Sequence, residues 1–402
     1  MESKNNKKEP WIRSRHRLVR VVAGAVLQPY VRLRYGIRVE RFDSRGRQYL
    51  IAMNHQTAFD QFFVGLAFKD PVYFIATEDI FSIGFVSKVI RFLVNPIPIK
   101  KQTNDLRAVM TCMRVAREGG TIALAPEGNR TYSGRTCYIK PSIVKLTRAL
   151  KLPLAIFRIE GGYGVQPRWS DVIRRGRMRA YVSRVVEPEE YKNMTDEALL
   201  RLIEESLWVD EASLGGEFHH RRRAEYLERA MYVCPYCGLT TFESRGDVTT
   251  CRTCGRQIRY LPTKELRGVG FDFPFPFVGQ WYDYQCEFVN SLDLERHLTQ
   301  PLYTDTACLS EVILYQRKKL LRNAVTIRLY GDRMEVDEDL VFPFRETAAV
   351  TVLGRNKLNV YCHDRVYQFK GSPRFNALKY VNLFHRYKNM IEDSEHGKFL
   401  GL

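Results

Sequence analysis

The sequence predicts three parts in order: an α/β domain whose largely parallel sheet is flanked by helices, a small four-cysteine module, and a mostly β C-terminal domain. Between residues 37 and 186, strand-like apolar runs alternate with helical segments, which is typical of a largely parallel sheet. Two Cys-x-x-Cys pairs follow. From residue 311, short strands separated by turns lead into one amphipathic helix. A chain of 402 residues can bury the cores of two or three such domains.

The charge of the chain is unusual for a globular protein. Apolar content of 45% and charged content of 27% are ordinary, but the formal net charge is +18. Residues 1–47 hold thirteen Lys and Arg against four Asp and Glu, which places +9 of that total in a short segment. Such clustering indicates an anionic partner, either nucleic acid or acidic lipid headgroups. Salt-bridged helix faces or simple solubility do not explain the clustering.

The sequence favours a cytoplasmic location without a membrane span. The apolar run at residues 21–27 is far shorter than the roughly eighteen residues that a spanning helix needs. No small-residue cleavage site follows a proper apolar segment, so a secretory signal is not expected. The nine cysteines are mostly not arranged as a disulfide framework, which agrees with a reducing compartment.

Residues 1–35 are expected to form a basic, amphipathic helical segment. Helical periodicity runs from Trp11 to Gln28, and Pro29 is expected to end or kink the helix. Two sides are expected: a charged one with Arg13, Arg17 and Arg20, and an apolar one with Trp11, Leu18, Val22 and Val26. Such a helix can pack on the domain that follows or lie among lipid headgroups with its arginines toward phosphates. The sequence leaves both readings open.

The α/β domain is expected over residues 36–210. The expected strands are Tyr49–Met53, Val72–Ala76, Ile97–Ile99, Thr121–Ala125, Leu154–Ile159 and Met178–Val186. The expected helices include Phe59–Phe68, Ile83–Phe92, Asp105–Glu118 and Pro141–Leu150, and Asp196–Glu205 reads as a surface helix. Sites in such sheets lie beyond the carboxyl ends of the strands.

The stretch from Asn54 to Asp60 follows the first of these strands and leads into a helix. A separation of five residues on one helix would turn Asp60 about 140° away from His55, so the pair needs a strand-to-helix corner. Thr57 as N-cap and Asp60 in the first turn come close to a capping box, which supplies that corner. Asp60 can then accept from one imidazole nitrogen while the other nitrogen faces a substrate hydroxyl. The arrangement predicts a general base with an orienting carboxylate.

A second stretch, Ala125 to Thr131, follows the strand at residues 121–124, so Glu127 and His55 both lie just past strand ends. Together the two stretches resemble the glycerolipid acyltransferase family, typified by 1-acyl-sn-glycerol-3-phosphate (lysophosphatidate) acyltransferases. The resemblance covers roughly residues 30–210. The first motif of the family corresponds to Asn54-His55 with Asp60, and the third to Glu127-Gly128-Asn129-Arg130-Thr131. The second motif corresponds only approximately to Pro96–Lys101, where Lys101 takes the place of the usual Arg. The fourth corresponds to Leu152–Ile156.

The resemblance implies a peripheral membrane enzyme that transfers a fatty acyl group to the free hydroxyl of lysophosphatidate, at the inner face of the cell membrane. The donor is a thioester of coenzyme A or of acyl carrier protein, and the anionic membrane surface is a partner. His55 is expected to deprotonate the hydroxyl, with Asp60 orienting the ring. The expected acceptor-binding residues are Lys101, Glu127, Gly128 and Arg130. For Arg130 the chemistry is direct, because a guanidinium meets two phosphate oxygens at once.

The four-cysteine module predicts a structural zinc site. Cys234 and Cys237 form one Cys-x-x-Cys pair, Cys251 and Cys254 form the other, and thirteen residues separate the pairs. Each pair precedes a glycine, as in a tight knuckle whose amides point at thiolate sulfur. Four thiolates suit tetrahedral zinc and leave no position for a reactive water, so the module is expected to be a zinc ribbon over residues 232–262. The other cysteines are expected to be packing residues: Cys112, Cys137, Cys286, Cys308 and Cys362.

A helical linker is expected over residues 211–231, starting near Arg221, and the third domain over residues 263–402. Residues 268–284 show no clear pattern. The expected strands are Val312–Tyr315, Val325–Tyr330, Arg333–Val336, Leu340–Phe344, Ala348–Leu353, Leu358–Cys362 and Val366–Phe369. A helix follows with Phe375, Leu378, Val381, Phe384 and Tyr387 on one side. Seven strands capped by a helix are similar to a pleckstrin-homology-type barrel.

Three other functions are compatible with parts of the sequence. The chain can be an acyltransferase for another lysolipid acceptor. A zinc ribbon with a net charge of +18 is also compatible with a nucleic-acid binder, but His55, Asp60 and the Glu127–Arg130 stretch would then have no purpose. The last alternative is a lipid-binding scaffold without activity, against which the intact His55 and Asp60 argue. No nucleic acid partner is therefore expected.

Overall fold

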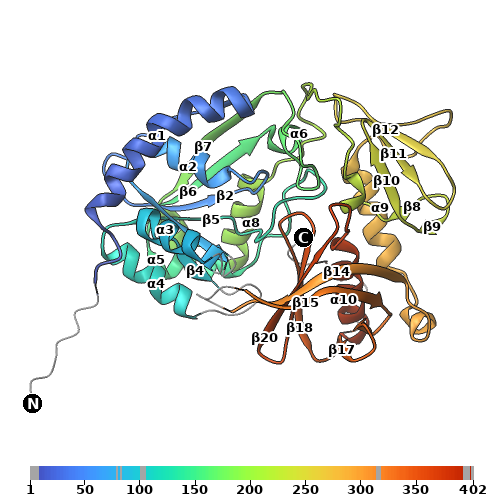
Figure 1. Cartoon of the computed structure of the whole chain (residues 1–402). Coiled ribbons are helices and arrows are strands. Elements are labelled where there is room, and N and C mark those ends of the chain that lie inside the picture. Colours follow the sequence, from blue (N-terminus) through green and yellow to red (C-terminus); the bar gives the residue numbers. More distant parts are fainter. Residues whose placement is uncertain are drawn as a thin grey trace, which may run out of the picture.

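A computed structural model describes residues 9–77, 80–81, 84–99, 106–313, 318–392 and 399. Figure 1 shows an α/β domain, a small antiparallel module at its side (yellow) and a C-terminal β domain with one long helix (orange to red). The expected order of the three parts is confirmed.

The α/β domain is built on a seven-stranded sheet in the order β1-β7-β6-β2-β5-β3-β4. All neighbouring strands run parallel except β6 and β7, so the expected largely parallel sheet is confirmed. The six expected strands all form, and Ile37–Val39 adds one at the edge. The strands are β1 Ile37–Val39, β2 Leu50–Met53, β3 Val72–Thr77, β4 Ile97–Ile99, β5 Thr121–Leu124, β6 Leu154–Glu160 and β7 Met178–Val186.

Helices cover both faces of this sheet. They are α1 Ser14–Tyr35, α2 Asp60–Ala67, α3 Phe85–Val94, α4 Leu106–Arg117, α5 Ser142–Leu150, α6 Gly162–Val165, α7 Pro188–Lys192 and α8 Asp196–Leu207. Side chains alternate along a strand, so Ile51 and Met53 pack with α1 and α2 while Leu50 and Ala52 pack with α4, α5 and α8. Two of the expected helix starts, Ile83 and Asp105, lie outside the described residues.

Of the two outcomes expected at Pro29, the end of the first helix is wrong. It continues through Pro29 to Tyr35 and ends at Gly36, whose φ is 62°. Val31 and Tyr35 are buried beyond the proline, and their packing keeps the last turns helical. The arginines expected on the charged side of this helix do not all point to solvent. Arg20 donates from Nη2 to the carbonyl oxygen of Phe68 at 2.6 Å, which attaches α1 to the end of α2.

The prediction of a linker helix near Arg221 is wrong. Only a short 3₁₀ turn forms, η2 at Leu227–Arg229. The N–H of Ala224 donates to the carbonyl oxygen of Gly246, and the N–H of Leu227 donates to Ser244 Oγ. Because the neighbouring module satisfies these main-chain groups, a helix is not needed to satisfy them.

The four-cysteine module contains two small antiparallel sheets. One pairs β8 Val233–Cys234 with β9 Gly238–Leu239. The other has β10 Phe242–Arg245, β11 Val248–Cys251, β12 Gln257–Tyr260 and β13 Leu266–Gly268 in sequential order. The unassigned stretch after it contains a helix, α9 at Val278–Asn290, followed by the 3₁₀ turn η3 at Leu294–His297.

The C-terminal domain is an antiparallel sheet in the order β17-β16-β15-β14-β20-β19-β18, so its first strand pairs with its last. The strands are β14 Tyr303–Glu311, β15 Lys319–Leu329, β16 Arg333–Val336, β17 Leu340–Pro343, β18 Thr347–Leu353, β19 Lys357–Cys362 and β20 Arg365–Gly371, and α10 covers Leu378–Ile391. The prediction of a first strand at Val312–Tyr315 is wrong, because the first strand of the domain is β14, which ends at Glu311. Residues 314–315 lie outside the described part of the chain. Polar Thr304, Asp305 and Thr306 hide the strand in the sequence.

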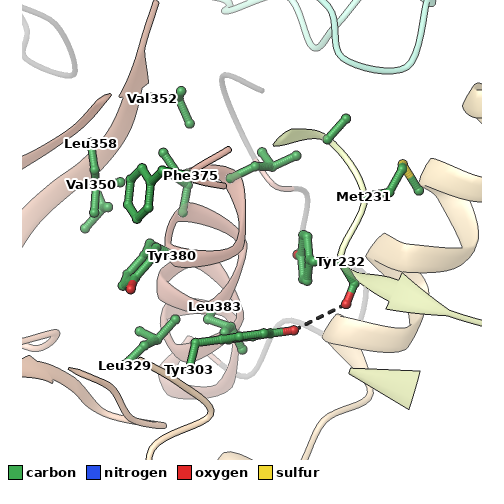
Figure 2. Packing of buried hydrophobic residues seen from close by; sticks show 14 of the residues in the cluster. Met231, Tyr232, Tyr303, Leu329, Val350, Val352, Leu358, Phe375, Tyr380 and Leu383 are labelled. Carbon is green, nitrogen blue, oxygen red and sulfur yellow. Dashed lines mark hydrogen bonds between the residues drawn. The ribbon is translucent and has the colours of Figure 1, made fainter. Parts of the chain in front are cut away.

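The module and the C-terminal domain share one continuous core. Figure 2 shows Tyr232 from the module facing Tyr303, whose hydroxyl donates to the carbonyl oxygen of Tyr232 at 3.3 Å. The same buried cluster includes Tyr132 and Trp169 of the α/β domain. Shared packing of this kind places the C-terminal domain firmly against the α/β domain.

Candidate active site

His55 and Asp60 form a hydrogen-bonded pair at the carboxyl end of β2. Nδ1 of His55 lies 2.8 Å from Oδ2 of Asp60. The Asp60 carboxylate is completely buried, whereas the His55 side chain is 25% exposed. An ionised carboxylate only accepts hydrogen bonds, so Nδ1 carries the proton and Nε2 keeps its lone pair. The pair therefore has the form of a base with an orienting carboxylate.

The Asp60 carboxylate is held by the loop that precedes it. Oδ2 accepts from the N–H of Gln56 at 2.6 Å, and Oδ1 accepts from the hydroxyl of Thr57 at 2.6 Å and from its N–H at 2.9 Å. The expected N-cap role of Thr57 is wrong. Helix α2 begins at Asp60, Phe59 is its N-cap, and the Thr57 hydroxyl is directed to the carboxylate. The positive end of α2 further favours the charge on Asp60.

The amide of Asn54 fixes the start of this loop. Its Nδ2 donates to the carbonyl oxygen of Ile159 at 2.8 Å, and its Oδ1 accepts from the N–H of Ile159 at 2.7 Å. The parallel pairing of β2 with β6 reaches only Met53 and Phe157, so the Asn54 side chain extends the ladder beyond the strand end. His55 thereby leaves the sheet in a defined direction.

Glu127 links the two loops that the sequence brings to this rim. Its Oε1 accepts from the N–H of His55 at 2.7 Å, and its Oε2 accepts from the N–H of Cys137 at 2.6 Å. Burial raises the pKa of Glu127 to about 8, although both N–H groups act in the opposite direction. Glu127 thus supports the loop that carries His55. The sequence did not identify the contribution of Cys137, because a main-chain donor has no residue signature.

Arg130 lies at the same rim with an unpaired nitrogen. Within the described residues, its Nη1 is buried and has no hydrogen-bond partner. Burial, followed by the charge of Arg168, lowers the pKa of Arg130 to about 10. Since both Glu127 oxygens accept main-chain N–H groups, that carboxylate is already occupied. The other expected cation, Lys101, lies outside the described residues.

Arg168 is a site residue that sequence reasoning missed. It is 3% exposed and follows α6 in a loop without any motif. Its Nη1 donates to the carbonyl oxygen of Arg130 at 2.9 Å, and its plane lies over the ring of Tyr132 at 4.4 Å. Arg168 therefore supports the main chain that carries Arg130.

A cavity of about 1580 Å³ brings these side chains together. His55, Gly128 and Arg130 line it, while Asp60 and Glu127 lie behind the wall. Apolar side chains from five helices make up much of the remaining lining, among them Val19, Leu27, Leu66, Ile90, Leu93, Val109 and Leu146. The cavity thus joins the imidazole of His55 and the guanidinium of Arg130 to a large apolar space.

The four expected metal ligands also converge. The Sγ atoms of Cys234, Cys237, Cys251 and Cys254 all lie within 4.8 Å of one another. Cys234 Sγ is 3.8 Å from Cys254 Sγ, and Cys237 Sγ is 3.5 Å from Cys251 Sγ. A tetrahedral zinc ion with four Zn–S bonds requires sulfur atoms about 3.8 Å apart. The donor set and its spacing therefore fit zinc.

Within the described part of the chain, no helix combines the length and the apolar character needed to span a bilayer.

Comparisons with known proteins match part of this chain. No curated protein sequence matches the chain. Among solved structures, the chain is similar to the crystal structure of the 1-acyl-sn-glycerophosphate (LPA) acyltransferase, PlsC, from Thermotoga maritima, with a TM-score of 0.39 and 21% identity over 48% of this chain and 76% of that chain. Residues 36–159 match the family model described as Acyltransferase. The part of the chain that matches this model includes His55, Asp60, Glu127 and Arg130.

Proposed function

We propose that the chain transfers a fatty acyl group from an acyl thioester to the free hydroxyl of lysophosphatidate. The observation that supports this best is the shared cavity. It joins the His55 base to the guanidinium of Arg130, whose Nη1 has no partner among the described residues, and to a large apolar space. A hydroxyl, a phosphate and an acyl chain are the three parts of such an acceptor.

The proposed chemistry needs only one base. Nε2 of His55 takes the proton of the acceptor hydroxyl as its oxygen attacks the thioester carbonyl carbon. Asp60 stabilises the imidazolium through the hydrogen bond at Nδ1. The tetrahedral intermediate then collapses, the C–S bond breaks, and the leaving thiolate receives the proton from Nε2. The products are an ester and a free thiol, and no covalent enzyme intermediate forms.

Arg130 is proposed to bind the phosphate of the acceptor. A phosphate monoester carries close to two negative charges at neutral pH, and a planar guanidinium can meet two of its oxygens. Because Nη1 of Arg130 is buried without a partner in the described structure, a bound anion would satisfy it. Gly128, which is exposed and lines the cavity, leaves the approach open beside it.

The apolar part of the cavity is proposed to hold acyl chains. Its volume of about 1580 Å³ is larger than most small-molecule pockets, which measure roughly 300–1,000 Å³. Leu27, Leu66 and Ile90 line it from three different helices. A fatty chain placed there would leave water and bring its reacting end toward His55.

The outer sides of α1, α3 and α4 are proposed to rest on an anionic membrane. Large apolar side chains are exposed there, namely Leu18, Val21, Val22, Val26, Phe85, Phe92, Leu106 and Met110, and we call this set the membrane face. Arg17 on α1 and Lys88 on α3 are exposed beside it, which suits acidic headgroups. Other side chains of the same helices line the cavity, and Leu106 of the membrane face lines it too, so the apolar space adjoins this face.

One zinc ion is proposed to bind the four cysteines. When bound, it would cross-link the two knuckles of the module. The Sγ atoms of Cys234 and Cys251 belong to residues buried in the core shared with the C-terminal domain, so the role is structural.

Product analysis tests the proposed function. The purified protein is incubated with a labelled acyl thioester, either of coenzyme A or of acyl carrier protein. The acceptors offered are lysophosphatidate, lysophosphatidylcholine and monoacylglycerol. The expected product is labelled phosphatidate, formed much faster than any other lipid. Transfer to another member of the panel in preference to lysophosphatidate would reject the acceptor assignment. If no acyl group is transferred to any of them, the proposed acyltransferase activity is wrong.

A further inference from the structure

Arg168 connects the acyltransferase domain to the C-terminal domain at the edge of the cavity. While Nη1 donates to the carbonyl oxygen of Arg130, Nη2 donates to the carbonyl oxygen of Val352 at 3.0 Å. Nε lies 3.5 Å from the carbonyl oxygen of Gly354. One buried guanidinium thus holds the main chain of Arg130 and the end of β18 a few ångströms apart.

The C-terminal domain contributes the wall opposite Arg130. Val352, Leu353 and Gly354 line the same cavity as His55 and Arg130. Gly354 begins the turn between β18 and β19 and has a φ of +60°. A Cβ built on Gly354 would meet no atom within 4 Å, so open space lies beside this turn.

The positive charges around this space are incompletely balanced. Arg355, the next residue, has a carboxylate partner, with Nη1 3.0 Å from Oδ1 of Asp171. Arg168 donates to main-chain carbonyl oxygens, and Nη1 of Arg130 has no partner in the described residues. A buried guanidinium nitrogen without a partner is costly beside a second positive charge, and a bound anion lowers that cost.

We propose that the turn between β18 and β19 forms one wall of the acceptor headgroup pocket. In this arrangement the phosphate of the acceptor lies between the guanidinium of Arg130 and Gly354. Arg168 is a positioning residue that sets the distance between the two domains. This inference rests on the proposed function, and it makes the C-terminal domain part of the substrate site.

Two substitutions at Gly354 test the inference as a matched pair. Asn and Asp are nearly isosteric, and both tolerate a positive φ better than other side chains. Gly354→Asp places a carboxylate beside Arg130, where it competes with the phosphate, and Gly354→Asn adds the same bulk without charge. Equal thermal unfolding of the two variants shows that their folds are comparable.

Relative to Gly354→Asn, Gly354→Asp is expected to raise KM for a short-chain lysophosphatidate by about tenfold or more, which corresponds to about 1.4 kcal/mol. The two variants are expected to have the same kcat on it. With monoacylglycerol, which lacks phosphate, the two variants are expected to have equal KM. Equal KM of both variants for lysophosphatidate would overturn the inference.

Binding of glycerol 3-phosphate, measured without thioester, separates this inference from the proposed function. The wild type and Gly354→Asn are expected to bind it, and Gly354→Asp at least about tenfold more weakly. Equal binding by the two variants, or no binding by the wild type, overturns the headgroup wall even if phosphatidate is formed. If binding follows the expected order but no phosphatidate is formed, the proposed reaction fails and the headgroup wall stands.

Discussion

Oε1 of Glu127 lies 2.7 Å from the main-chain nitrogen of His55, so a buried carboxylate directly supports the loop that carries the proposed base. The second oxygen of Glu127 performs the same task for Cys137. The carboxylate is therefore a brace between two strand-end loops. Because it is completely buried, its protonation also affects the stability of the fold.

Glu127 is expected to make stability fall as pH rises. Its pKa is about 8 in the folded chain, against a usual value of 4.5, because burial disfavours the charged form. Below pH 4.5 both states are protonated and no penalty exists. Between pH 4.5 and 8 the folded state binds the extra proton, so the free energy of unfolding decreases by up to about 1.4 kcal/mol per pH unit. Denaturant unfolding from pH 5 to 8 measures this slope.

Glu127→Gln is expected to remove this contribution to the slope and to lower stability at acidic pH, where the wild-type carboxyl is protonated and carries no burial penalty. A glutamine amide offers one oxygen, so its NH₂ group would face one of the two main-chain N–H groups. Glu205→Gln, on the exposed side of α8, is the control and should retain the wild-type slope. An unchanged slope in Glu127→Gln would show that another group causes it.

His55→Ala is expected to abolish nearly all turnover, and Asp60→Asn to reduce kcat by roughly two or more orders of magnitude. The reason is that Nε2 supplies the base and Asp60 holds the ring and its charge. Initial rates of phosphatidate formation measure both effects, with acceptor binding measured separately and expected to change much less.

A surface pair provides the matched control. Nε2 of His219 lies 2.8 Å from Oε2 of Glu217, and both side chains are more than half exposed. His219→Ala removes a comparable histidine–carboxylate pair and is expected to leave the rate unchanged. Substantial activity in His55→Ala would disprove the mechanism.

Arg130→Ala is expected to reduce kcat/KM for lysophosphatidate by about thirty- to a hundred-and-fifty-fold, which corresponds to about 2 to 3 kcal/mol for a lost charge-assisted pair. Arg130→Lys should recover little, because the charge remains but the two-pronged geometry is lost. Parallel kinetics with monoacylglycerol provide the comparison. A similar loss on both acceptors would assign Arg130 a structural role instead.

The purified chain is expected to contain about one zinc ion, bound by the four cysteines. Cys237→Ser should lose the metal and lower the unfolding temperature, because three thiolates hold zinc less tightly. Cys308→Ser, a partly buried cysteine of β14, should keep it. Elemental analysis after preparation under reducing conditions measures the metal, and its absence from the wild type would contradict the zinc site.

The double substitution Leu18→Ser and Phe85→Ser is expected to weaken binding to vesicles that contain anionic phospholipid. These side chains are 66% and 78% exposed, so replacing them removes apolar contact area from the membrane face without opening the core. Transfer to a detergent-dispersed acceptor should be retained. Vesicle sedimentation measures the binding.

Trp208→Ser serves as the control for the membrane face. Trp208 is 51% exposed but does not belong to the three helices of that face. Vesicle binding should therefore be unchanged by this substitution. If the double substitution also leaves binding unchanged, α1 and α3 do not contact the bilayer.

The α/β domain could be predicted from the sequence because its central strands are buried on both faces. Strands such as β2 and β5 therefore appear as short continuous apolar runs. His55 and Asp60 were equally accessible to sequence reasoning, since a single corner positions both. Local sequence determines both features, and the structure agrees with it there.

The remaining features depend on contacts between distant segments. Arg168 belongs to the site only because β18, nearly two hundred residues later, lies beside it. The predicted helix near Arg221 does not form because Gly246 satisfies the N–H of Ala224. Neither partner can be identified from the residues near Arg168 or Arg221, so a reading based on motifs and periodicity could not find them.

The pairing of β14 with β20 has a consequence for biosynthesis. During translation, His55 and Asp60 emerge early, but the sheet that carries Val352 to Gly354 closes only after Gly371 has been made. A nascent or truncated chain that ends before that strand contains His55 and Asp60, but the strand that pairs with β14 and β19 is missing, so the wall with Val352 to Gly354 is not held in place. Closure of this wall of the cavity therefore depends on β20, the strand of the sheet that is made last.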